Sequence, residues 1–114
     1  MGEKIRKTVF YKNYFLDYYS EQTIDVQNKI DWTLTLLETI EIVPIVYFKK
    51  ITGIKRLYEI RIIHGGNIFR IFCFFDREQV VVLGNGFTKK TQKTPSNQIE
   101  LAQKIMNDYF NEKK

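Results

Sequence analysis

The sequence predicts an α+β domain: a small, mostly antiparallel, twisted sheet with helices packed on it. Three observations lead to this prediction. Residues 57–89 alternate runs of β-branched and aromatic residues with turn residues, which is typical of consecutive β-hairpins. Residues 20–43 and 94–109 repeat apolar residues every three or four positions, which is typical of amphipathic helices. The 114 residues contain no internal repeat, low-complexity segment or linker, so we expect a single domain over residues 1–114.

The chain begins with a predicted strand and a short aromatic helix. Apolar and polar residues alternate over residues 5–11, which favours a strand that joins the hairpins in one sheet. Residues 13–19 place four aromatic side chains at helical spacing, namely Tyr14, Phe15, Tyr18 and Tyr19. We expect most of them to pack on the sheet; the alternative is that exposed tyrosines stack on RNA bases.

The clearest helix follows, with Ser20 as its predicted N-cap. Its apolar stripe has spacings of four, four and three residues and consists of Val26, Ile30, Leu34 and Leu37. The helix should end before Pro44, because a residue that precedes proline is pushed out of the α region. Residues 42–48 fit a short strand and an apolar linker equally well, and a basic connection over residues 49–56 leads into the first hairpin.

The first hairpin contains an unusual pair of like charges. Gly65 and Gly66 have the φ freedom that a two-residue turn requires, and with this turn Arg61 lies directly opposite Arg70. Like charges at opposite positions of a sheet repel each other, so a sequence selected only for stability would avoid this pair. A polyanion between the two guanidinium groups would turn the repulsion into attraction. This end of the hairpin is therefore a candidate binding site.

A second turn, over residues 76–79, pairs the strand before it with the strand after it, so that both faces of the sheet continue into the next strand. The expected pairs are Phe75 with Val80, Phe72 with Leu83, and Arg70 with Asn85. One face then has a polar end, formed by Glu59, Arg61, Arg70 and Asn85, and an apolar end, formed by Phe72, Phe74, Val81 and Leu83. The opposite face is almost wholly apolar and should be core: Tyr58, Ile60, Ile62, Phe69, Ile71, Cys73, Phe75, Val80 and Val82.

A final helix should cover the apolar end of the mixed face. Thr94 and Pro95 predict its start, with Thr94 as the N-cap and proline at the first helical position, where its missing N–H costs nothing. One side of this helix presents Ala102, Ile105, Met106 and Tyr109. We expect these side chains to pack on the apolar end defined above.

Positive charge is concentrated on the hairpins and their flanks. The chain has 18 Lys and Arg against 13 Asp and Glu, and residues 49–93 hold ten basic side chains against three acidic ones. Such a surface is expected of a protein that binds the phosphates of a nucleic acid. The candidate RNA-binding residues are Lys49, Lys50, Lys55, Arg56 and Lys93. Scattered lysines are usually only a solvated surface, but two of these charges are arginines within strands, so we prefer nucleic acid.

Other kinds of site have little support. No Cys or His pair has metal-ligand spacing and no glycine-rich loop precedes Lys-Ser or Lys-Thr, so we expect neither a metal nor a cofactor. Cys73 falls on the apolar face, which favours a small buried hydrophobe over a nucleophile. His64 lies beside the glycine turn, where an exposed turn residue is more common than a general base. Without a recognisable signal peptide, myristoylation signal or membrane span, we expect a cytoplasmic protein with no membrane partner.

The remaining residues fit RNA cleavage. The 2′-hydroxyl of RNA attacks the adjacent phosphate, and the protein supplies a base, positive charge and a proton donor for the departing 5′-oxygen. Arg61 and Arg70 suit the charge role, because a guanidinium stays ionised and binds phosphate through two hydrogen bonds. Lys89 and Lys90 are the candidate acid or base. Glu59 could orient a guanidinium or accept a proton, and a plain ion pair with Arg70 is the interpretation we favour.

Four segments carry a resemblance to a known family. They are KRLYEIRI from Lys55, GGNIFRIFCFF from Gly65, VVVLGNGFTKKTQKTP from Val80, and IELAQKIMNDY from Ile99. Together they resemble the RelE/HigB-like toxins of bacterial type II toxin–antitoxin systems, and more closely the phage-derived Gp49-like branch. The resemblance covers residues from about Lys49 to Tyr109. Its most specific parts are Leu57 to Arg61, the Arg70 strand, and the run Phe87-x-Lys89-Lys90-x-x-Lys93-Thr94-Pro95.

The resemblance implies a RelE-like fold, with two N-terminal helices on one face of a small sheet and a concave active site on the other. It also implies an endoribonuclease (an mRNA interferase) that inhibits translation by cleaving mRNA in the ribosomal 30S A site without a metal. Carried over by position, Arg61 matches a basic residue of the second strand and Arg70 the arginine that contacts the scissile phosphate. Lys89 or Lys90 matches the basic residue after the fourth strand.

The relatives differ in the residues that act as general acid and general base. Some relatives use histidines or a C-terminal tyrosine, and here no histidine lies near the basic loop. Tyr109 is the candidate tyrosine, although it fits the packing face of its helix equally well. The implied partner besides mRNA and ribosome is a cognate antitoxin, usually a helix-turn-helix protein, through which the toxin would meet DNA only indirectly.

Two other functions fit the same residues. The first is a non-catalytic module that binds RNA or a ribosome through the basic face. The second is a protein-interaction subunit whose basic groove binds an acidic or helical partner. RNA cleavage products distinguish the nuclease from both, because only the nuclease produces them.

Overall fold

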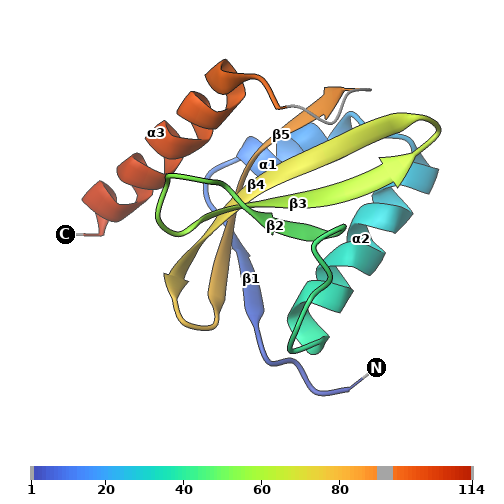
Figure 1. Cartoon of the computed structure of the whole chain (residues 1–114), viewed down its shortest axis with the longest axis horizontal. Helices are drawn as coiled ribbons and strands as arrows, with labels where there is room; N and C mark the ends of the chain where they lie inside the picture. The colour runs from blue at the N-terminus through green and yellow to red at the C-terminus, as the bar shows by residue number, and fades with distance from the viewer. Residues whose placement is uncertain (1, 90–93, 114) are drawn as a thin grey trace.

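The computed structural model describes residues 2–89 and 94–113 (Figure 1). Within these ranges the chain forms five strands and three helices. In chain order they are β1 (Lys7–Phe10), α1 (Tyr14–Ser20), α2 (Ile24–Thr39), β2 (Phe48–Lys50), β3 (Leu57–His64), β4 (Asn67–Arg77), β5 (Val80–Lys89) and α3 (Ser96–Glu112). The predicted α+β class is confirmed, and the ambiguous segment 42–48 precedes a short strand that begins at its last residue.

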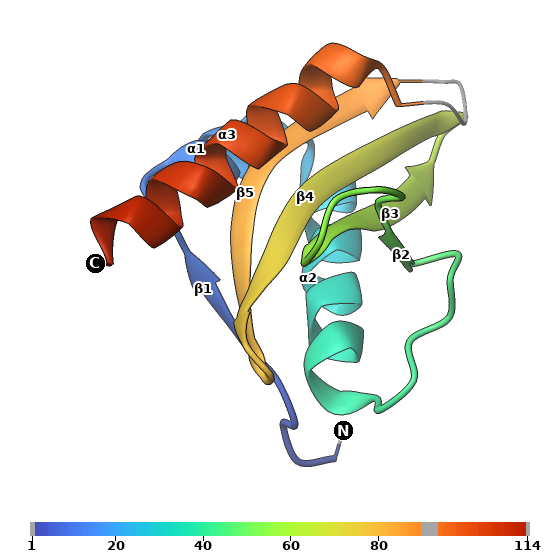
Figure 2. The ribbon, with the colours of Figure 1, turned by 60° about the vertical axis from the view of Figure 1, so that its left-hand side comes forward.

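The strands form one sheet in the order β1-β5-β4-β3-β2. Neighbouring strands run antiparallel except β1 and β5, which are parallel. Helices α1 and α2 pack on one face of the sheet, and α3 lies along the other (Figure 2). The arrangement that the resemblance implied, with two N-terminal helices on one face, is therefore confirmed. None of the described helices is both long and apolar enough to cross a membrane.

Each face of the sheet has its own apolar core. The core under α1 and α2 contains Phe15, Tyr18, Val26, Ile30, Leu37, Ile60, Ile62, Phe69, Ile71, Cys73, Val81 and Leu83. The core under α3 contains Tyr11, Ile51, Leu57, Phe72, Phe74, Val82, Ala102, Ile105 and Met106. On the α3 face of β3, the side chains change from apolar to charged between Leu57 and Glu59. The polar end of this face is thus free to form a site beside a fully packed core.

The first hairpin has the predicted register. Arg61 pairs with Arg70, and the pairing continues to His64 opposite Asn67 at the turn. The turn residues Gly65 and Gly66 have φ values of +60° and +79°, a conformation that L side chains rarely adopt. The two adjacent glycines in the sequence therefore determine the register of β3 against β4.

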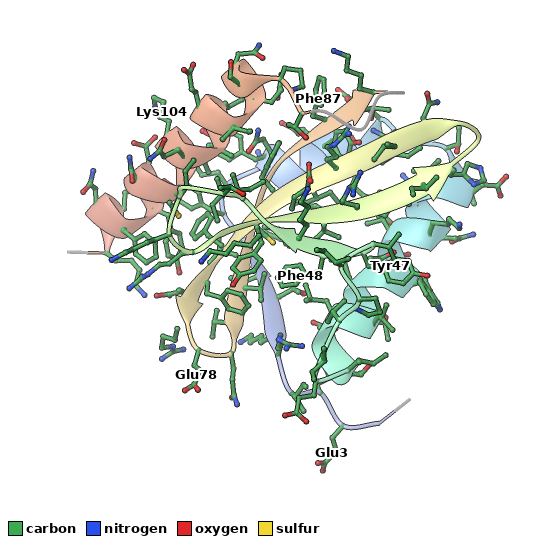
Figure 3. The ribbon with its side chains drawn as sticks, viewed as in Figure 1. Glu3, Tyr47, Phe48, Glu78, Phe87 and Lys104 are labelled. Carbon is green, nitrogen blue, oxygen red and sulfur yellow. The ribbon has the colours of Figure 1, made fainter. Side chains whose placement is uncertain are left out.

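The second hairpin differs from the predicted register. Strand β4 continues to Arg77, which pairs with Val80, so only Glu78 and Gln79 form the turn (Figure 3). The three predicted pairs are wrong: Phe75 pairs with Val81, Cys73 with Leu83, and Arg70 with Phe87. The causes are the two-residue turn in place of the predicted four-residue turn and two irregularities in the ladder, one extra residue in β4 after Phe75 and one in β5 after Leu83. Each bulge shifts the pairing by one position.

The shifted register exchanges the faces on which the β5 side chains lie. Val82 packs in the core under α3, whereas Val81 and Leu83 pack in the core under α1 and α2. The prediction that Val81 and Leu83 would share a face with Phe72 is therefore wrong. Because side chains alternate along a strand, a one-residue slip is enough to reverse every assignment.

Gly86 allows α1 to approach the sheet closely. A Cβ atom at this position would lie 2.2 Å from the ring of Tyr18, so the phenol ring rests directly on the backbone of β5. The Tyr18 hydroxyl also shares a hydrogen bond of 2.6 Å with the hydroxyl of Thr88. Burial raises the pKa of Tyr18 to about 12. This tyrosine is thus a core residue, as predicted for most of the aromatic group.

Two helices begin at residues other than those predicted. The N-cap of α2 is Thr23, whose side chain accepts a hydrogen bond of 3.3 Å from the backbone N–H of Val26. Ser20 instead ends α1, and its hydroxyl donates to a backbone carbonyl of that helix. Helix α3 begins one residue later than expected, with Pro95 as its N-cap. Thr94 is therefore not a cap, and its hydroxyl is used elsewhere.

Hydrogen bonds and an ion pair hold the carboxyl end of α3 in place on two sides. On one side, the Tyr11 hydroxyl donates a hydrogen bond to Glu112. On the other, the Tyr109 hydroxyl donates to Oδ2 of Asp76 at 2.7 Å, and the ammonium group of Lys113 lies 2.5 Å from the same oxygen. These polar contacts join the residue after β1 and the end of β4 to the last turn of the helix.

Candidate functional site

The two arginines of the first hairpin lie on one face of the sheet. Arg61 on β3 and Arg70 on β4 are direct cross-strand partners, and side chains at opposite positions of adjacent strands project to the same side. The structure therefore brings together the pair that the glycine turn predicted. Their side chains lie on the α3 face, beyond the end of its apolar core.

Glu59 lies next to both arginines. Its Oε1 is 3.0 Å from Nε of Arg70, and its Oε2 is 3.8 Å from Nε of Arg61. The carboxylate is almost fully buried, because Glu59 is 4% exposed. The favoured interpretation of Glu59, an ion pair with Arg70, is confirmed. One carboxylate thus offsets the repulsion between two guanidinium groups.

Arg70 lies beneath the surface. Its side chain is 0% exposed, whereas that of Arg61 is 12% exposed. Burial lowers the pKa of Arg70, the Glu59 carboxylate raises it, and the neighbouring Arg61 lowers it further. In this arrangement a phosphate at the surface meets Arg61 before Arg70. Direct phosphate contact by Arg70, which the resemblance implied, requires displacement of groups that now cover it.

Thr94 completes the polar cluster, which we define as Glu59, Arg61, Arg70 and Thr94. Its hydroxyl donates a hydrogen bond of 2.8 Å to Oε1 of Glu59. The sequence pattern predicts a helix cap at this position, and no local pattern signals a contact across 35 positions. Thr94 is therefore the residue of the cluster that sequence reasoning missed.

A hollow of about 290 Å³ opens beside this cluster. It is lined by Lys49, Lys50, Ile51, Thr52, Glu59, Thr94 and Ile99. Lys49 on β2 is the direct cross-strand partner of Glu59, so an exposed ammonium group and the buried carboxylate share this face. The hollow thus has a carboxylate on its wall and two lysines beside it, contributed by three separate parts of the chain.

The predicted basic residues at the exit of the sheet are only partly described. Lys89 is exposed at the end of β5 and pairs with Ile68, two positions closer to the glycine turn than Arg70. Lys90 and Lys93 lie outside the described residues. Asn85, placed by prediction on the same polar face, is 6% exposed, and among the described residues its amide has no hydrogen-bond partner.

Three predicted residues do not line the hollow. Lys55 and Arg56 precede β3, at the end opposite the glycine turn, and the Arg56 guanidinium lies 5.0 Å from the ring centre of Phe110. Tyr109 donates to Asp76, six residues along β4 from Arg70, or roughly 20 Å at the usual rise per residue. Burial and the hydrogen bond to Asp76 raise the pKa of Tyr109 to about 12. Its place in the fold is in the α3 packing layer.

The remaining candidates are placed as follows. Cys73 is fully buried and burial raises its thiol pKa, which confirms a hydrophobic role over a nucleophilic one. His64 is the last residue of β3, opposite Asn67. Among the described residues, no group of three or more His, Cys, Asp and Glu side chains is placed to hold a metal ion.

The family comparison covers most of these elements. The family described as "Phage derived protein Gp49-like (DUF891)" matches residues 17–107. The chain belongs to the Gp49-like family. This is a RelE-like toxin family, so the resemblance found in the sequence is confirmed, and membership indicates a toxin of a toxin–antitoxin system with an antitoxin partner. A search of curated proteins found no match.

Proposed function

We propose that this Gp49-like protein is an endoribonuclease that cleaves mRNA on the translating ribosome and thereby inhibits translation. The observation that carries the proposal is the arrangement of Glu59. Its carboxylate lines a basic hollow and forms an ion pair with the buried Arg70. It also lies beside the more exposed Arg61. A fixed carboxylate beside cations is suited to take a proton next to a bound phosphate.

In the proposed reaction, Glu59 accepts the proton of the RNA 2′-hydroxyl. The 2′-oxygen attacks the adjacent phosphorus, the bond to the 5′-oxygen breaks, and a 2′,3′-cyclic phosphate forms. Lys49 and Lys50 bind the phosphate backbone at the hollow, and Arg61 binds it from beside Glu59. Lys89 is the described candidate that protonates the departing 5′-oxygen. As the RelE resemblance implies, no metal is required.

Arg70 acts through Glu59 in this proposal. Because its guanidinium is buried and lies 3.0 Å from the carboxylate, Arg70 is a positioning residue that fixes the base. Thr94 fixes the same oxygen from the other side. A carboxylate held by two neighbours has little freedom to leave the geometry that proton transfer needs.

The test is cleavage of mRNA by purified protein in a translating extract, mapped by primer extension. Wild type should give discrete breaks with cyclic-phosphate or 3′-phosphate ends, and Glu59→Gln should lose cleavage by about 100-fold or more while it still binds RNA. Lys104→Ala, a change on the exposed side of α3 (Figure 3), is the matched control and should cleave normally. Equal cleavage by Glu59→Gln would contradict the proposed base.

A second candidate function is favoured by the burial of Arg70. A guanidinium that is 0% exposed and paired with Glu59 can serve as a purely structural ion pair below a surface that binds RNA without cutting it. In that case wild-type protein binds ribosomes or RNA and arrests nothing. Growth arrest on expression, relieved by Glu59→Gln at equal protein level, supports the nuclease; RNA binding by the wild-type protein without growth arrest supports the binding module.

A further inference from the structure

A second groove lies on the other side of the sheet edge, between α2 and β3. It has a volume of about 530 Å³ and is lined by Lys29, Trp32, Thr33, Val46, Tyr47, Arg61, Ile62 and Ile63. The proposed nuclease function uses none of its apolar side chains. Tyr47 lies beside α2 (Figure 3), and its ring packs edge to face on Trp32 with the centroids 5.5 Å apart.

The groove is part of an exposed apolar patch. Three of the lining residues, Trp32, Val46 and Ile63, are 48%, 44% and 47% exposed. Isolated exposed apolar residues are ordinary, but three that line one groove mark an interaction surface. Their burial by a partner would remove a large apolar area from water.

The backbone at the floor of the groove offers an open strand edge. Strand β2 pairs with β3 only from Tyr58 to Ile60, and one more bond joins the N–H of Arg61 to the carbonyl of Tyr47. Beyond this point, no described strand lies on that side of β3. Because hydrogen-bonding direction alternates along a strand, the N–H of Ile63 points the same way as that of Arg61, into the groove.

Charge indicates what can bind there. Lys29 supplies the positive charge of the groove, because the guanidinium of Arg61, the other charged lining residue, lies beside Glu59 on the α3 face. The ammonium group of Lys29 lies 3.3 Å from the carbonyl of Ile63, at the open edge itself. The chain as a whole carries a net charge of +5, so a second copy would repel it, whereas an acidic partner would complement Lys29.

We propose that this groove binds an extended segment of a protein partner that pairs with β3 beyond Arg61. The segment has apolar side chains at alternate positions, which fill the space between Trp32 and Ile63, and acidic residues that face Lys29. Recognition by added strand combines backbone hydrogen bonds with pockets for every second side chain, and both elements are present here. RNA is the less suitable occupant, because the open edge of β3 offers backbone groups that pair with a strand, and the Trp32 and Tyr47 rings pack on each other.

The test starts with a random dodecapeptide library displayed on phage and selected on the full-length protein. The selected peptides should alternate apolar residues and contain Asp or Glu. The best one, synthesised, should shift the fluorescence of Trp32, the single tryptophan, and slow amide exchange at Ile63. Trp32→Ala and Ile63→Asp should each weaken binding by about tenfold or more. Leu101→Asp, an exposed apolar residue on α3, is the matched control and should bind normally.

Several outcomes would overturn the proposal. They are a selection without enrichment, selected peptides that are basic, equal binding by wild type and Ile63→Asp, and an unchanged amide at Ile63. Competition by single-stranded RNA for the same Trp32 signal would assign the groove to nucleic acid. Dimerisation of the free protein that Ile63→Asp abolishes would assign it to a second copy. Because Ile63 is half exposed, its variant should fold, which circular dichroism confirms before binding is measured.

Discussion

Glu59 and Arg70 form an ion pair of 3.0 Å that is buried on the side of the arginine and opens to a hollow on the side of the carboxylate. The pair therefore joins the packed interior of the sheet to the candidate site. Removal of either partner changes both stability and surface chemistry, and the two effects can be measured separately.

Glu59→Gln should destabilise the fold by about 3 kcal/mol, because two neighbouring guanidinium groups lose the carboxylate that offsets their charge. Urea unfolding followed by circular dichroism measures this loss. Inorganic phosphate should restore part of the lost stability in the variant and stabilise wild type less. Glu100→Gln, an exposed change on α3, should leave the unfolding midpoint unchanged. A variant as stable as wild type would show that the charges are not coupled.

Thr94→Val should cost about 1 kcal/mol of stability, since it removes one hydrogen bond to a buried carboxylate. It should also reduce cleavage by a larger factor than Thr52→Val, which changes an exposed threonine on the wall of the same hollow. The measurement is single-turnover cleavage of mRNA alongside thermal unfolding. Equal rates for the two valine variants would separate Thr94 from the chemistry.

Gly86→Ala should destabilise the protein by about 2 kcal/mol or more, because the new Cβ would lie 2.2 Å from the Tyr18 ring. Gly84→Ala is the matched comparison. Its new Cβ would meet Ile105 at 3.7 Å and a backbone oxygen at 3.3 Å, which the structure accommodates with small shifts. Thermal unfolding of both variants is the measurement, and a milder effect at position 86 than at position 84 would contradict the close approach of α1.

Asp76→Asn should lower stability at neutral pH and have less effect in acid. Hydrogen bonds from Lys113 and Tyr109 hold the pKa of Asp76 below its ordinary value. A carboxylate with a lowered pKa stabilises the fold above its unfolded-state pKa of about 4 and loses this contribution as the pH falls through the folded value. The melting temperatures of wild type and variant should therefore converge below about pH 4. A constant difference across the titration would show that the carboxylate charge is not involved.

Lys49→Ala and Lys50→Ala should weaken RNA binding uniformly across sequences. If each lysine contacts one phosphate, each substitution makes the plot of the logarithm of the binding constant against the logarithm of salt concentration less steep, by about 1 in slope. Lys104→Ala removes one positive charge as well, but Lys104 lies on α3 and pairs with Asp108 at 2.9 Å. This variant should have the slope of the wild type. Fluorescence anisotropy with a labelled oligonucleotide at several salt concentrations gives the slopes. An unchanged slope for both lysine variants would remove the hollow from the RNA interface.

Local patterns predicted the first hairpin in full. Two adjacent glycines allow a single short turn, so the pairing of Arg61 with Arg70 follows from the sequence. The register of the second hairpin could not be predicted in this way. Bulges at Asp76 and near Gly84 each add a residue, and the alternation of apolar and polar side chains does not reveal it. The segment Gly84-Asn85-Gly86 was the available signal, since glycine inside a strand often marks a bulge.

The candidate site was predictable only in part. Glu59, Arg61 and Arg70 come from one hairpin, so their neighbourhood follows from strand pairing. Burial of Arg70 and the contact of Thr94 with Glu59, across 35 positions, come from tertiary packing, which no periodicity encodes. Lys55 and Arg56 were grouped with the site because they are basic and close in sequence, and the structure leaves them outside the lining of the hollow.

The parallel pairing of β1 with β5 has a consequence for synthesis of the protein. Lys7 pairs with Val80 and Phe10 with Leu83, so the first strand made by the ribosome waits for the last one before the sheet closes. Thr94 joins the polar cluster later still. A nascent chain therefore holds no assembled polar cluster until most of it has left the exit tunnel.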